Sequence, residues 1–125
     1  MIAVDTSSWI AYLGGGDAPD VELVDRALED RQVCLPPVVL AELLSDPKLP
    51  KRIQSLFLSI PLLDVTDAYW QRAGALRAKL IAKRRKAPLA DVLIAQTCID
   101  HGVALVTRDG DFRNLARVSS LKLLG

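Results

Sequence analysis

Short apolar runs alternate along this chain with longer segments in which apolar residues recur at helical spacing. The apolar runs predict strands at residues 1–4, 32–35, 61–65, 103–106 and 121–124. The segments between them predict helices at residues 6–13, 21–30, 37–45, 50–60, 66–86 and 89–101, with a short helix or turn at 109–116. Strands that alternate with helices are typical of a parallel sheet packed between helices. The sequence therefore predicts an α/β sandwich.

The length and the hydrophobic content bound the class of protein. A chain of 125 residues fits one domain, residues 1–125, with a core of its own. Half of the residues are hydrophobic, yet no uninterrupted apolar run approaches the roughly 20 residues that span a bilayer. The N-terminus has no basic stretch, and Asp5 interrupts its apolar residues at once, so we expect no signal peptide. We therefore expect a cytoplasmic protein that does not associate with a membrane.

Net charge, cysteines and histidine point to no site. The formal net charge of +1 identifies no class of partner. Cys34 and Cys98 lie beside apolar residues, where small buried thiols are far commoner than a disulfide or a thiolate metal site. The single histidine, His101, ends a predicted helix, where it suits the helix dipole. The chemistry must come from other side chains.

Four acidic residues adjoin predicted core segments, where a lone carboxylate is costly unless it is paired, protonated or bound to metal. Asp5 ends the first apolar run, and Asp109 follows the run at 103–106. Glu42 has apolar neighbours on both sides within 38–44, and Asp91 begins the helix predicted at 89–101. In open α/β sheets, ligands bind beyond the carboxyl ends of the strands. We therefore expect the four acids to share one crevice.

A divalent metal is the simplest reason for such a group. Mg²⁺ and Mn²⁺ prefer hard oxygen ligands, and without a cation clustered carboxylates repel one another. The alternative explains each acid singly: Asp5 as a helix N-cap, Asp91 as a first-turn acid favoured by the dipole, and Asp109 as a turn residue. It does not explain Glu42 among its apolar neighbours, so the shared site is favoured.

Four segments, in order, resemble the PIN domain, and in particular the VapC toxins of bacterial and archaeal toxin–antitoxin pairs. They are Val4-Asp5-Thr6-Ser7, Leu40-Ala41-Glu42-Leu43, LADVLIA at 89–95 and VTRDGDF at 106–112. Each motif is weak alone, but the ordered set is specific and covers essentially the whole chain. The resemblance implies a five-stranded parallel sheet with helices on both faces, and a Mg²⁺-dependent endoribonuclease that hydrolyses RNA phosphodiesters.

The resemblance also implies roles for individual residues and partners. The catalytic acids would be Asp5, Glu42, Asp91 and Asp109, with Mg²⁺, or Mn²⁺ in its place, bound by Asp5, Asp91 and Asp109. Thr6 and Thr107 would orient carboxylates or water. Asp111 could substitute for Asp109 or assist it, and Asp109 is favoured because it is nearer the strand end. A cognate VapB-type antitoxin and a homodimer are further expectations.

Basic residues supply candidate contacts to RNA phosphates. Lys79, Lys83 and Lys86 fall on one face of the helix predicted at 66–86, and Arg108 precedes Asp109. Such residues are ordinarily a solvated helix face, but a nuclease with an acidic crevice needs positive flanks to hold its substrate. We therefore expect these four residues to bind RNA.

Some alternatives remain open at this stage. The apolar residues Ile53, Leu56, Phe57 and Leu58 predict either a groove for an antitoxin helix or contacts of the core or a homodimer. A phosphate-accepting receiver domain is disfavoured, because the first strand offers Asp5 alone and no lysine ends the late strand. A non-catalytic PIN-like scaffold normally lacks the acids. A PIN nuclease that processes RNA outside a toxin pair, or that cuts DNA, is not excluded.

Overall fold

Four parallel strands form the centre of the computed structural model, which describes residues 1–124. The strands are β1 (Ile2–Val4), β2 (Val33–Cys34), β3 (Ala104–Val106) and β4 (Leu123–Leu124), in the order β2-β1-β3-β4. Ile2 pairs with Val33 on one side and with Ala104 on the other, so β1 lies inside the sheet. Parallel neighbours place the carboxyl ends of β1 and β3 at the same edge. The predicted α/β architecture is confirmed.

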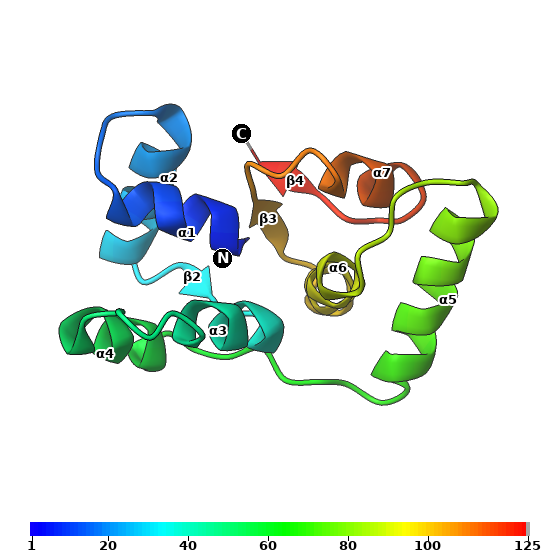
Figure 1. The fold of residues 1–125 in the computed structure, drawn as a ribbon, viewed down its shortest axis with the longest axis horizontal. Helices are drawn as coiled ribbons and strands as arrows, with labels where there is room; N and C mark the ends of the chain where they lie inside the picture. The colour runs from blue at the N-terminus through cyan, green and yellow to red at the C-terminus, as the bar shows by residue number, and fades with distance from the viewer. Residues whose placement is uncertain (125) are drawn as a thin grey trace.

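Helices cover both faces of this sheet (Figure 1). They are α1 (Thr6–Leu13), α2 (Pro19–Glu29), α3 (Pro37–Leu44), α4 (Lys51–Ser59), α5 (Tyr69–Ala82), α6 (Leu89–His101) and α7 (Phe112–Arg117). The α1–α2 pair lies on one face and α6 on the other, with α5 outermost against α6. None of the helices within residues 1–124 combines the length and apolar character that crossing a bilayer requires.

The hydrophobic core contains side chains from the N-terminal, central and C-terminal parts of the chain. Trp9 of α1 and Phe57 of α4 are fully buried and meet edge to face, with ring centroids 5.2 Å apart. Phe112 of α7 is also fully buried. Cys34 and Cys98 are free, buried thiols, as the sequence predicted. Because Phe57 belongs to the core, only its neighbours in the segment 53–58 remain as candidates for a docking groove.

The fifth predicted strand, at residues 61–65, forms only one bridge. Leu62 pairs in parallel with Leu35, through one hydrogen bond from Leu35 to Pro61 and one from Leu63 to Leu35. A proline cannot donate to a ladder, and Leu62 and Val65 are about half exposed, so little burial extends the pairing. The described residues therefore form four strands, with this segment as a minimal edge beside β2.

The predicted helix at 66–86 is also shorter than expected, because α5 spans Tyr69–Ala82. Arg84 adopts a left-handed conformation with φ 55°, and the amides of Arg84 and Arg85 donate to Ile81 and Leu80, respectively, both at 2.9 Å. This arrangement closes a helix C-terminus in the Schellman manner. Lys86 therefore lies in the loop between α5 and α6, and not on a face of α5 as predicted.

Candidate functional site

The acids come from the residues that follow β1 and β3 and from the helices α3 and α6. Asp5 directly follows β1, and Asp109 and Asp111 lie in the turn between β3 and α7. Asp91 is in the first turn of α6, and Glu42 lies on α3. Both central strands are parallel, so the residues after them reach the same place, as in other open α/β sheets.

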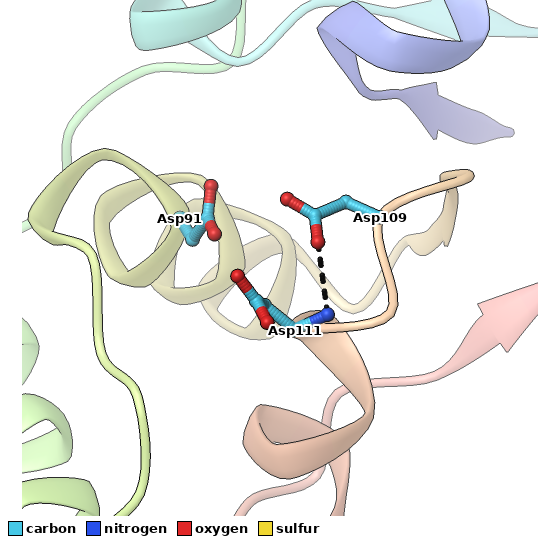
Figure 2. A group of neighbouring side chains, drawn as sticks. All are labelled: Asp91, Asp109 and Asp111. Atoms are coloured by element: carbon cyan, nitrogen blue, oxygen red, sulfur yellow. Dashed lines mark hydrogen bonds between the residues drawn. The ribbon is translucent and has the colours of Figure 1, made fainter.

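Three carboxylates from α6 and the turn before α7 face one another. One carboxylate oxygen from each of Asp91, Asp109 and Asp111 lies within 4.8 Å of the others. Figure 2 shows the three side chains pointing into a common space, with the amide of Asp111 donating 2.9 Å to Asp109 Oδ1. Asp109 and Asp111 thus enter the cluster together. Of the two alternatives that the sequence left open for Asp111, the geometry favours a residue that assists Asp109 over one that replaces it.

Hydroxyl groups hold the first acid, Asp5, which is only 5% exposed. Its Oδ2 accepts hydrogen bonds from Thr107 at 2.8 Å and from Ser7 at 3.0 Å. The same Thr107 oxygen accepts 3.0 Å from the amide of Asp109. Thr107 therefore joins the acid after β1 to the loop that carries two others. Asp5 occupies an N-cap position, but its side chain bonds no amide of α1, so capping does not explain it.

Glu42 is exposed, although its apolar sequence neighbours predicted a buried carboxylate. Val39 and Leu43 of α3 are buried, but Glu42 itself is exposed. The expectation of a buried carboxylate at this position was wrong, because helical periodicity turns adjacent residues to different faces. The hydroxyl of Thr6 donates 2.7 Å to Glu42 Oε1, so the residue that follows Asp5 holds the Glu42 carboxylate.

Among the clustered acids, Asp91 has the pKa that the other carboxylates shift most, and its side chain is half-buried. The pKa of Asp91 is raised from 3.8 to about 7, chiefly by burial and further by the negative charges of Asp109, Asp5, Asp111 and Glu42. Four other carboxylates therefore raise the cost of ionising Asp91. Such a set of hard oxygen donors fits a divalent cation, which would relieve the repulsion.

The predicted RNA-binding residues do not share one face. Arg108 donates to both oxygens of Asp20, at 2.6 and 2.8 Å, so its guanidinium points toward α2. Lys79 donates 3.3 Å to the carbonyl of Val118, and Lys83 lies at the C-terminal end of α5. Lys86 Nζ lies 3.3 Å from Asp111 Oδ2. Among these four, Lys86 alone contacts a carboxylate of the cluster.

Two functional contacts were missed in the sequence. Ser7 donates to Asp5 and also accepts 3.0 Å from the amide of Arg108, but the sequence predicted no role of its own for it. Asp20 pairs with Arg108 from 88 positions away. The first could have been found from the hydroxyl-rich Thr6-Ser7 pair after the acid; no sequence signal announces the second.

Comparisons with known proteins agree with this geometry. The family model described as "PIN domain" matches residues 2–118. The chain is 31% identical over 129 aligned positions to the VapC ribonuclease Mb1587 of Mycobacterium bovis and to ribonuclease VapC11 of Mycobacterium tuberculosis, covering 98% of this chain and 96% of each relative.

Solved structures with the same fold come from toxin–antitoxin complexes. VapBC2 from Rickettsia felis, bound to a DNA fragment from its promoter, superposes with a TM-score of 0.77 at 25% identity and covers 99% of this chain and 98% of the matched one. VapBC-1 from nontypeable Haemophilus influenzae gives the same TM-score at 15% identity, with coverages of 99% and 97%. The first match also extends to sequence, and the second shows the fold alone.

Proposed function

Because this chain belongs to the PIN domain family, in its VapC branch, we propose that it is a Mg²⁺-dependent endoribonuclease and the toxin of a type II toxin–antitoxin pair. The observation that carries the proposal is the group of three carboxylates, Asp91, Asp109 and Asp111, whose oxygens lie within 4.8 Å of one another. The charges of Asp5 and Glu42 also act on Asp91, which a family match by itself would not guarantee. Its relatives are named ribonucleases, and its structural neighbours are complexes with VapB-type antitoxins. Residues 1–125 would form one nuclease domain that acts in the cytoplasm.

The residues that would hold the cation are Asp5, Asp91 and Asp109, with Asp111 beside them. Such a cation, Mg²⁺ or Mn²⁺, would activate a water and neutralise charge on the phosphodiester. Thr107 fixes the orientation of Asp5 and of the 107–111 loop, and Thr6 holds the Glu42 carboxylate. Asp91, with its raised pKa, is the carboxyl whose charge depends most on a cation being present.

The proposed partners follow from the surface as well as from the family. Leu56 lines a groove of about 490 Å³ together with Leu28, Val33 and Ile60. The neighbouring Leu58 is 61% exposed, whereas Phe57 is core. We assign this groove to an apolar helix of the VapB-type antitoxin. A homodimer is part of the same proposal.

Cleavage of RNA by purified protein tests the proposal. Mg²⁺ or Mn²⁺ should support cleavage, and EDTA should abolish it. Attack by water leaves a 5′-phosphate and a 3′-hydroxyl on the products, whereas attack by the ribose 2′-hydroxyl leaves a cyclic phosphate. Cleavage that persists in EDTA, or cyclic phosphate ends, would contradict the metal mechanism. Parallel RNA and DNA oligonucleotides of the same sequence separate a ribonuclease from the DNA-cutting alternative.

Substitutions assign the carboxylates. Asp5→Asn, Glu42→Gln, Asp91→Asn and Asp109→Asn should each remove most activity and leave the fold intact. Asp111→Asn should cost less than Asp109→Asn, because Lys86 already shares the charge of Asp111. A larger loss of activity in Asp111→Asn would make Asp111, and not Asp109, the fourth catalytic acid. Expression without the antitoxin should slow growth, and Asp91→Asn should relieve the effect; normal growth would favour RNA processing outside a toxin pair.

A further inference from the structure

One basic side chain extends into the acidic cluster from the loop between α5 and α6. Figure 1 shows this loop leaving α5 at Lys83 and passing toward α7 and the start of α6. The left-handed turn at Arg84 sets that path, since it ends α5 before Lys86. Lys86 Nζ then lies 3.3 Å from Asp111 Oδ2.

The carboxylate that Lys86 contacts is one of the three that share the candidate metal site. Asp111 has an oxygen within 4.8 Å of oxygens of Asp91 and Asp109. An ammonium bound there and a divalent cation bound by the same cluster are like charges that draw on the same carboxylates. Each therefore weakens the hold of the other.

The side chain of Lys86 is much more exposed to solvent than that of Asp111. The Lys86 side chain is 72% exposed, whereas that of Asp111 is 27% exposed. The backbone of Asp111 is anchored at the cluster, because its amide donates to Asp109 Oδ1. An exposed pair of this kind is worth little by itself, so the lysine is easily released. Its long, flexible side chain can then reach a phosphate at the mouth of the site.

We propose that Lys86 exchanges between two partners: it neutralises Asp111 in the metal-free protein and contacts an RNA phosphate once a divalent cation occupies the cluster. This inference rests on the proposed metal-dependent ribonuclease. It makes metal and RNA binding mutually reinforcing, because the cation releases the side chain that the RNA uses. Coupling of this kind is reciprocal, so bound RNA also tightens the hold on the cation.

Metal binding without RNA gives the first test. Mn²⁺ is titrated into the wild-type protein, Lys86→Gln, Lys86→Arg and Lys83→Gln, with free Mn²⁺ followed by its paramagnetic resonance signal. Lys86→Gln should bind Mn²⁺ more tightly, by about threefold at low salt. Lys86→Arg keeps the charge and should stay near wild type. Lys83→Gln is the matched control, because Lys83 forms no ion pair within the residues described.

RNA binding gives the second test, with a short fluorescent RNA whose phosphorothioate linkages slow cleavage. Mn²⁺ should raise the affinity of the wild-type protein for this RNA more than that of Lys86→Gln, by about threefold or more. Equal Mn²⁺ affinities in the wild type and Lys86→Gln would overturn the exchange and leave the metal site standing. Absence of Mn²⁺ binding to the wild type would overturn the proposed function as well. Circular dichroism verifies that each variant is folded.

Discussion

Substitution of Asp91 by asparagine should stabilise the metal-free protein, and the gain should grow with pH. The carboxyl of Asp91 has a pKa raised from 3.8 to about 7 by burial and by the four surrounding acids. Below pH ~4 both the folded and the unfolded chain hold this proton. Between pH ~4 and ~7 only the folded chain holds it, so the wild type loses stability as the pH rises. Above pH ~7 the full penalty remains.

The size of the effect follows from the same shift. A change of this extent corresponds to an upper limit of about 4 kcal/mol. Asp91 is only half-buried, and solvent screening reduces the figure to about 2 kcal/mol. Its place in the first turn of α6 offsets part of the gain, since the helix dipole favours a charge there by about 0.5 kcal/mol. That offset is nearly constant where the carboxylate is ionised, so the slope with pH is the decisive quantity.

Urea unfolding of the wild type and Asp91→Asn at pH 4, 5, 6, 7 and 8 in EDTA measures the difference. It should rise from near zero at about pH 4 to about 2 kcal/mol at pH 8. The exposed loop residue Asp17 lies outside the cluster, so Asp17→Asn should give a difference that does not change with pH. A destabilised Asp91→Asn at pH 8, or a difference that is flat across this range, would refute the repulsive cluster.

At pH 7.5, added metal should make the wild type more stable than Asp91→Asn, the reverse of the order in EDTA. A cation that binds only the folded protein stabilises it by about 2.7 kcal/mol at one hundred times its dissociation constant. The wild type should gain this amount from Mg²⁺ or Mn²⁺, whereas Asp91→Asn should gain much less because it lacks a ligand. Equal gains in the two proteins would place the cation elsewhere.

Three further substitutions test the contacts around the site. Thr107→Val removes the donor to Asp5 and should lower Mn²⁺ affinity about tenfold or more, measured by titration, with little change in secondary structure. Asp20→Asn frees the guanidinium of Arg108; RNA binding at low salt, measured by fluorescence anisotropy, should strengthen if Arg108 can then contact phosphate, and unchanged binding would assign it a purely structural role. Phe57→Ala should cost about 3–5 kcal/mol in urea unfolding because the ring is fully buried, and a loss below 1 kcal/mol would return Phe57 to the antitoxin groove.

Much of the fold was predictable because its signals are local. The helices at α1 and α6 have the predicted bounds or nearly so, since glycines end both of them. The segment 61–65 failed as a strand because pairing depends on a neighbour and on burial, neither of which the run of apolar residues reveals. The end of α5 was misplaced because a left-handed arginine, Arg84, carries no sequence signature.

The positions of acids that follow the end of a strand could be predicted from the sequence. Asp5 follows β1 directly and Asp109 lies shortly after β3, so the parallel sheet brings them together. Glu42 was selected for a wrong reason, burial, although its contact with Thr6 places it at the site. The pairing of Arg108 with Asp20 was out of reach, because it depends on how the α1–α2 pair packs on the sheet.

The link between Asp5 and Thr107 spans 102 positions, and it has a consequence for the protein as it is made. Asp5 leaves the ribosome among the first residues, but the strand and the hydroxyl that complete its surroundings come near the end of translation. A nascent chain that stops before Thr107 has β1 without β3 and lacks two of the three clustered carboxylates. The carboxylate cluster is therefore assembled only as the last quarter of the chain folds back onto its first strand, and truncated products of the gene would lack it.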